Sequence, residues 1–424
     1  MGSKRNAGVG TTSRTLRTGR RYNRYAGVGL AVGAAGIAIA SRYLARRAHR
    51  ATEDGLVDWR RAEQIAASRL ARVPGALTPA ELREAELAYG QIMNRVVPLL
   101  EQQLGLPLPG VVERHAVVNR AEWARANITT FEHLIGHLEP HIRNSTPDTG
   151  FAAGVAKLAN RFLTTQQIGF LLGYLGGRVL GQYDIALLSA EAEPGKLLFV
   201  EENIRATSMT LGVPLEDFRV WIALHETTHA YEFEANTWLR PYLRDHLERQ
   251  IAGMLGQAKT LQSDGLGALI KRVRESVDNP IAGFLGPEQR RLFEETQRVM
   301  ALVEGFSDWV MDEVGDQVLP DVASIRARFE ARRAQRRGAV ERLIARLTGL
   351  DLKLEQYRRG ERFVAGVAAT GGREAVKMIW SGAEALPSED EMNDPAAWLR
   401  RVAPQYVFAG AAARAADAPS QLTH

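Results

Sequence analysis

The chain has 424 residues, of which 45% are hydrophobic and 24% charged, and it contains no cysteine. This composition is that of a globular protein with a large core, and it excludes disulfides, thiolate nucleophiles and thiolate metal ligands. Eleven of the 54 basic residues, but none of the 49 acidic residues, lie within residues 1–50. The net charge of +5 therefore belongs to an N-terminal arm, and the mildly acidic remainder argues against a nucleic-acid partner.

The N-terminal arm divides into two parts. Residues 1–24 are polar and basic, which predicts disorder. Residues 25–50 form a Gly/Ala-rich apolar segment with a basic flank, and its uncharged run, residues 25–41, is barely long enough to span a membrane. Membrane contact through residues 25–41, a cleaved signal and a soluble arm all stay open, so the expected location is cytoplasmic or membrane-associated.

The remainder is predicted to form a single domain over residues 51–402, followed by an Ala-rich tail over residues 403–424. Apolar residues at helical spacing, punctuated by Pro and Gly, predict a mostly helical body. Thr78 followed by Pro79, for example, supplies an N-cap and a first helical position. Besides the helix that carries the main motif, helices are expected over residues 59–70, 78–96, 120–139, 150–181 and 321–348, and over residues 242–315 with a break at Asn279-Pro280.

Two short runs, residues 183–189 and 196–200, are predicted as strands, with a turn signal at Pro194-Gly195 between them. The expected fold class is therefore mainly α (α+β), with a small β-sheet or hairpin beside the helix that carries the main motif. The strand pair is expected to precede that helix directly.

The main motif is His225-Glu226-Thr227-Thr228-His229, an H-E-x-x-H pattern within an apolar helix that begins after Pro214 and ends before Pro241. On a helix, two histidines at this spacing share one face and can bind one metal ion. Glu226 lies beside them, where it can act as general base on a zinc-activated water. The alternative, two core histidines, would leave Glu226 as a buried charge without a purpose. The motif therefore predicts a zinc-dependent hydrolase.

A catalytic zinc ion usually has three protein ligands, so a third must come from elsewhere. Glu232 is on the same helix but about 10 Å along its axis from His225, and Glu234 points to another face. Glu304 is the better candidate, because Asp308 follows one turn later in a segment with helical apolar spacing. We expect Glu304 to bind the ion and Asp308 to accept the second N–H of a ligating histidine.

Segments beyond the motif make the chain similar to a family of zincin-like zinc metallohydrolases of actinobacteria and some Chloroflexi, often linked to the biosynthesis of a deazaflavin coenzyme. The resemblance covers roughly residues 55–402. It implies a mostly helical fold and a metal-dependent hydrolase of the glutamate-ligand zincin type. The segments that carry it, besides the motif helix, are Trp123–Asn127, Val179–Asp184, Val200–Ile204, Glu304–Asp308, Leu352–Tyr357, Gly360–Phe363 and Pro395–Trp398.

The expected function is that of a Zn²⁺-dependent metallopeptidase acting on a peptide or amide substrate. A small-molecule amidohydrolase and a catalytically inactive, metal-stabilised scaffold are the alternatives. Tyr357 is the candidate oxyanion stabiliser, with Lys353 and Arg362 as competitors, because all three lie in the late segments of the resemblance. The oligomeric state stays open.

Three further patterns are weaker. His133, His137 and His141 recur at helical spacing, but Pro140 interrupts the run, which argues against a second metal site. The arginine-rich stretch over residues 321–348 is expected to be a solvated helix face rather than an anion site. Residues 173–177, Gly-Tyr-Leu-Gly-Gly, lack the Lys-Ser/Thr of a phosphate-binding loop and are expected to serve helix packing or a turn.

Overall fold

A computed structural model of the chain describes residues 55–143, 151–184, 195–250, 253, 287–334 and 350–407. The predicted arm, the apolar run over residues 25–41 and most of the predicted tail lie outside the described residues, so their assignments and the location of the protein stay predictions. Tertiary contacts divide the chain into two units, residues 1–58 with 147–164 and residues 59–146 with 165–424. In the first unit, the described helical residues are the initial part of α5 (Phe151–Gly176).

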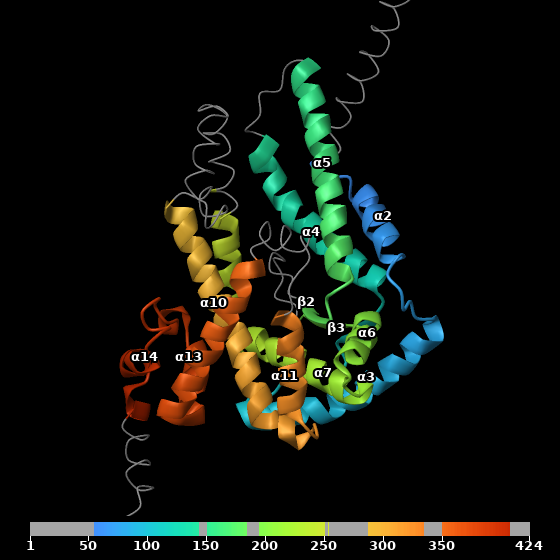
Figure 1. Ribbon diagram of the computed structural model, residues 1–424. Helices are drawn as coiled ribbons and strands as arrows, with labels where there is room; N and C mark the ends of the chain where they lie inside the picture. Colours follow the sequence, from blue (N-terminus) through green and yellow to red (C-terminus); the bar gives the residue numbers. More distant parts are fainter. Residues whose placement is uncertain are drawn as a thin grey trace, which may run out of the picture. The chain divides into compact units, whose positions relative to one another are not determined.

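The second unit is mainly helical, which confirms the expected fold class (Figure 1). A further helix covers residues 239–250. In the described part of the chain, no helix combines the length and apolar character needed to cross a membrane. Besides the end of α5, the helices of this unit are α2 (Trp59–Leu70), α3 (Pro79–Leu104), α4 (Arg120–Arg143), α6 (Glu201–Leu211), α7 (Leu215–Ala235), α10 (Pro287–Val314), α11 (Val322–Ala334), α13 (Leu350–Lys377) and α14 (Pro395–Val402).

Three strands form one small sheet in the order β1-β3-β2, namely β1 (His115–Val118), β2 (Gly181–Asp184) and β3 (Lys196–Val200). β2 runs antiparallel to β3 with Gly181 opposite Phe199, and β1 runs parallel to it. The prediction of β3 is confirmed, β2 begins earlier than expected, and β1 was not predicted. β1 has only four residues, His-Ala-Val-Val, all of them half-buried. This run is too short, and too uniformly apolar after its histidine, to show the alternation of apolar and polar residues that predicts a strand.

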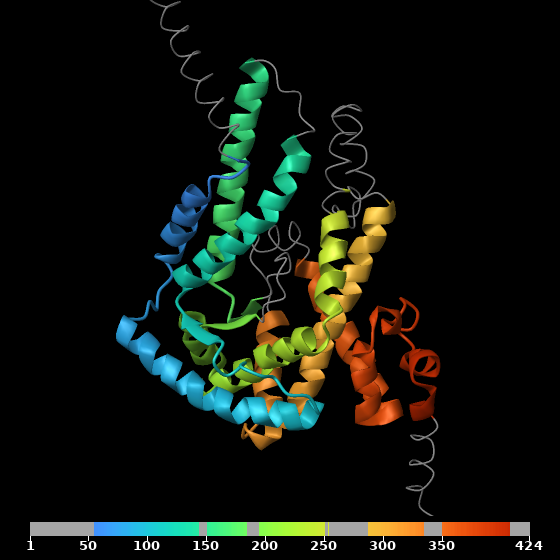
Figure 2. The same cartoon turned by 180° about the vertical axis from the view of Figure 1, so that it is seen from behind.

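The expectation that the strand pair directly precedes the motif helix α7 is wrong, because α6 lies between β3 and α7. α7 packs against α3, α6, α10 and β2, and Figure 2 shows α3 running along it. Most of its residues are buried, on every side of the helix. The helix that carries the H-E-x-x-H motif is therefore the centre of this unit.

The helices α10 and α13 cross with their backbones in contact. A Cβ atom on Gly360 would lie 1.8 Å from the carbonyl oxygen of Ala301, and one on Gly305 would lie 2.4 Å from the carbonyl carbon of Gly360. Only glycine permits this approach. Glu304 directly precedes Gly305, so the crossing of the two helices also fixes the position from which the Glu304 carboxylate faces α7.

We predict that Gly360→Ala lowers the free energy of unfolding by about 1–3 kcal/mol or more, because the new methyl group forces the two backbones apart. Urea unfolding would measure it. Gly90→Ala in α3 is the control, since a Cβ atom there meets nothing within 4 Å and should be neutral or stabilising by up to about 1 kcal/mol. Equal unfolding midpoints for the two variants would contradict the prediction.

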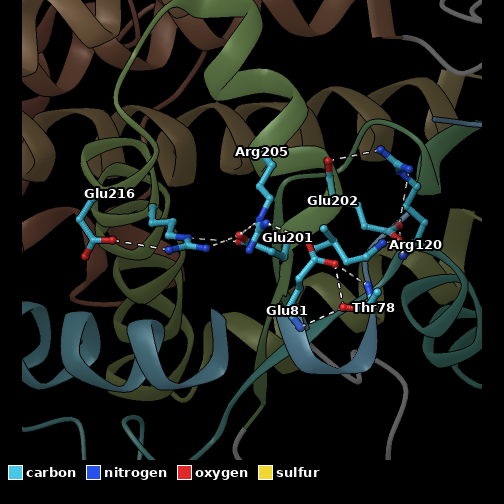
Figure 3. A network of polar contacts seen from close by, with 9 residues as sticks. Thr78, Glu81, Arg120, Glu201, Glu202, Arg205 and Glu216 are labelled. Carbon is cyan, nitrogen blue, oxygen red and sulfur yellow. Dashed lines mark hydrogen bonds and ion pairs between the residues drawn. The ribbon is translucent and has the colours of Figure 1, made fainter. Parts of the chain in front are cut away.

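Buried charges at the start of α6 connect the surrounding helices (Figure 3). Glu201 is fully buried and forms ion pairs with Arg219 of α7 and, at 2.8 Å, with Arg205 of α6. Arg205 in turn lies 3.6 Å from Glu81, which forms a capping box with Thr78 at the start of α3. This chain of contacts links α3, α6 and α7.

The next two residues bind other parts of the fold. The carboxylate of Glu202 accepts the backbone N–H groups of Leu77 and Arg120, both at 3.1 Å. The side-chain amide of Asn203 donates to the carbonyl oxygens of Gly176 and Val179, at 2.8 and 2.7 Å. The segment Val200–Ile204 is therefore an anchor between the sheet and the helices, which gives a structural reason for its part in the family resemblance.

Replacing Glu201 by alanine should lower the free energy of unfolding by about 3–5 kcal/mol, because it leaves the buried guanidinium of Arg219 without its main counter-charge. Glu216→Ala is a matched control. Glu216 pairs with the same arginine at 3.6 Å but its side chain is 56% exposed, so its loss should cost less than about 1 kcal/mol. Denaturant unfolding of both variants tests this, and similar losses would refute the distinction.

Candidate metal centre

The structure brings the three predicted metal ligands together. His225 and His229 lie one turn apart on α7, and their Nε2 atoms are 3.2 Å from each other. Glu304 reaches them from α10, with its Oε2 atom 3.7 Å from Nε2 of His225. One ligand atom from each of these residues lies within 4.8 Å of the other two. Two helices far apart in sequence thus point two nitrogens and one oxygen at the same volume.

These separations fit a zinc ion. Metal–ligand bonds of about 2.0–2.1 Å in a tetrahedral site place neighbouring ligand atoms about 3.3 Å apart. The separations of 3.2 and 3.7 Å lie close to that value. Two imidazoles and one carboxylate are also a donor set of catalytic zinc, with one coordination position left for solvent or substrate.

His229 is oriented by a carboxylate of its own helix. Its Nδ1 atom lies 2.7 Å from Oε2 of the fully buried Glu232, and 3.2 Å from the hydroxyl of Ser307 on α10. Although burial works against the charged form, the hydrogen bond and charge of Glu232 raise the pKa of His229 above its usual range. Glu232 therefore holds the ring so that Nε2 faces His225 and Glu304.

Asp308, and not Glu232, is the residue that the sequence predicts in this supporting role. Asp308 follows Glu304 by one turn of α10, and its Oδ1 atom lies 3.3 Å from a guanidinium nitrogen of Arg326 on α11. A contact of Asp308 with a ligating histidine stays a prediction. The spacing of Glu232 could have indicated this role, since a carboxylate three residues after a histidine lies on the same face of the helix as that histidine.

Glu226 is almost fully buried beside the three candidate ligands. Burial raises its pKa to about 7, with the charge of His229 opposing the shift and that of Glu304 adding to it. A backbone hydrogen bond from Tyr183 of β2 also stabilises its charged form. A carboxylate with a pKa near neutrality can both accept and return a proton at physiological pH.

The strand β2 leaves room for Glu226 because it begins with glycine. A Cβ atom on Gly181 would lie 2.6 Å from both Cγ and Oε1 of Glu226. Such a contact is shorter than van der Waals packing permits, so the Glu226 side chain would have to move. Gly181 lies in the segment Val179–Asp184 of the family resemblance, but no motif in the sequence indicates its contact with Glu226.

Contacts on both faces fix β2 beside α7. The Tyr183 hydroxyl donates to Glu234 at 2.8 Å, and Arg114 forms an ion pair with the same carboxylate at 2.7 Å. Gln182, on the opposite face of the strand, accepts the indole N–H of Trp123 at 2.7 Å. As expected, Glu234 faces away from the candidate ligands and is used to hold the strand.

The remaining site predictions are less constrained. Tyr357 and Lys353 lie on α13, but their side chains are outside the described residues, and Arg362 is an exposed residue that donates to the carbonyl oxygen of Arg358. The oxyanion stabiliser therefore stays a prediction. The side chains of His137 and His141 are also outside the described residues, and His133 is exposed.

Comparison with known proteins defines the class. The profile of the zincin-like metallopeptidase family matches residues 57–399, so the chain belongs to this family. It is also 36% identical to a protein from Chloroflexus aurantiacus whose crystal structure is titled as that of "a putative hydrolase with a novel fold". That match has a TM-score of 0.60 and covers 81% of this chain and 98% of the other. The comparison with curated proteins gave no match. The link to a deazaflavin coenzyme stays a prediction.

We predict that Gly181→Ala displaces Glu226 and destabilises the fold by about 1–3 kcal/mol. The same substitution in a Glu226→Ala background should cost close to nothing, because the obstructing carboxylate is gone. A double-mutant cycle measured by urea unfolding gives the coupling between the two residues. Equal costs in the two backgrounds would show that the glycine is not required for the close approach.

Proposed function

We propose that the protein is a zinc-dependent hydrolase of peptide or amide bonds, with His225, His229 and Glu304 as the zinc ligands. The spacing of their ligand atoms, close to that of tetrahedral zinc, is the observation that supports this most strongly. Cysteine is absent from the chain, and the nitrogen and oxygen ligands that remain suit zinc. When bound, a zinc ion there would polarise the scissile carbonyl and make a water molecule more acidic.

In this proposal Glu226 is the general base. Its position beside the ligands allows it to take a proton from the attacking water and to return that proton to the leaving amine. Gly181 and the backbone N–H of Tyr183 hold it in place from β2. Glu232 keeps the His229 ring in the orientation that ligation requires.

A peptide is the substrate that the position of β2 favours. In the described part of the chain, β2 pairs with β3 on one side only and forms an edge of the sheet. An extended peptide can bind such an edge through its main chain, and Glu226 contacts the strand itself. The scissile bond of a peptide held there would lie close to the general base.

The proposal predicts a separation of metal binding from turnover. The wild-type protein should contain one equivalent of zinc by mass spectrometry, and Glu304→Ala should lose it. Glu226→Gln should keep the zinc while its kcat on a library of fluorogenic peptides falls by about 10²–10⁴-fold.

Each outcome has a defined meaning. Undiminished zinc in Glu304→Ala would remove Glu304 from the ligand set, and undiminished turnover in Glu226→Gln would exclude it as the base. Cleavage of small amides but not of peptides would favour an amidohydrolase. A zinc-loaded protein that cleaves neither would favour a metal-stabilised scaffold.

A further inference from the structure

A cavity of about 560 Å³, separate from the residues of the metal centre, is lined by positively charged side chains. Four arginines line it, Arg69 and Arg72 at the end of α2, Arg178 just after α5, and Arg332 on α11. Glycines and one valine make up the rest of its described lining, which contains no acidic side chain. The volume is within the range of about 300–1,000 Å³ that is usual for small-molecule sites.

Some arginines elsewhere in the described chain pair with carboxylates. Among many examples are the pairs Arg114–Glu234 at 2.7 Å, Arg326–Asp312 at 2.6 Å and Arg401–Glu391 at 2.7 Å. Arg69, Arg72 and Arg332 form no ion pair with another described residue, as is also true of exposed arginines such as Arg60 and Arg83, but these three are gathered around one cavity. Guanidinium groups gathered in this way repel one another unless an anion joins them.

Two of the four guanidinium groups lie over aromatic rings of α5. The guanidinium carbon of Arg69 is 4.4 Å from the ring centre of Phe170, and that of Arg178 is 3.8 Å from the ring centre of Tyr174. Gly173 permits the first contact, since a Cβ atom there would lie 2.8 Å from Cδ of Arg69. The glycine-rich segment thus serves helix packing, as expected, and the packing orients arginine side chains toward the cavity.

The arginine-rich helix α11 has three different uses for its side chains. Arg326 lies between Asp308 and Asp312. Arg328 donates to the carbonyl oxygens of Leu211 and Gly212 at the end of α6. Arg332 lines the cavity. The expectation of a plain solvated face is therefore wrong for Arg326, which is 19% exposed, and Arg332 has a binding role available to it.

We propose that this cavity binds a small molecule carrying two or more phosphate groups. Guanidinium groups bind phosphate oxygens through paired, charge-assisted hydrogen bonds. Arginines supplied by α2, by α11 and by the segment after α5 can contact more than one phosphate group, and the cavity is larger than a single phosphate needs. The mildly acidic charge of residues 51–424 means that general attraction of anions by the protein does not explain the cluster.

Pyrophosphate is the probe, titrated into the full chain by calorimetry at constant ionic strength. We expect Arg72→Gln/Arg332→Gln to bind it at least 10-fold more weakly than wild type. Arg60→Gln/Arg83→Gln is the matched control, because it removes the same charge from exposed positions outside the cavity, and its affinity should be unchanged. Thermal unfolding checks that both double variants are folded.

Pyrophosphate also binds metal ions, so His225→Ala separates the two sites, and binding that survives in this variant supports the arginine cavity. The proposal is overturned by loss of binding in His225→Ala alone, by equal weakening in both double variants, or by no saturable binding to wild type. Citrate binding as tightly as pyrophosphate would also contradict it, because the cavity would then not prefer phosphate. None of these results depends on hydrolytic activity.

Discussion

Burial of ionisable groups along α7 is the constraint on which the rest of the structure depends. The helix is enclosed by α3, α6, α10 and β2, yet it carries Arg219, Glu226, His229 and Glu232 at positions shielded from solvent. Charges removed from water need specific partners. Arg219 pairs with Glu201 near one end of the helix, and His229 pairs with Glu232 near the other. The elements around α7 are placed where they supply such partners.

Close backbone approach is the second recurring device, and it acts on the same centre from two directions. Gly360 and Gly305 let α13 and α10 cross in contact, which sets the position of Glu304. Gly181 lets β2 approach α7 closely enough to touch Glu226. In both places a side chain larger than a hydrogen atom would move a carboxylate of the site. The glycines therefore act on the chemistry by positioning the groups that carry it.

The arginine cavity and the metal centre differ in how their charged groups are partnered. At the metal centre, each charged group has a nearby group of opposite charge or a candidate ligand role. In the cavity, charges of one sign accumulate, and two of the guanidinium groups lie over aromatic rings. In this proposal the bound anion supplies the counter-charge that the described lining of the cavity lacks.

The sequence by itself determined the helix that carries His225 and His229, the role of Glu304 as partner in the candidate site, and the mainly helical class. The histidine pair and the helical class follow from local spacing, because residues four apart on a helix share a face. Glu304 is indicated instead by its Glu-x-x-x-Asp pattern, which resembles that of glutamate-ligand zincins. Only the tertiary structure decided that Glu232 supports His229, that Gly181 abuts Glu226, that β1 joins the sheet and that four arginines meet. The last three depend on which elements pack together, and helical periodicity and motif spacing do not encode contacts between residues so far apart in the chain. The first depends on the direction in which a buried carboxylate turns, which spacing along the helix permits but does not fix.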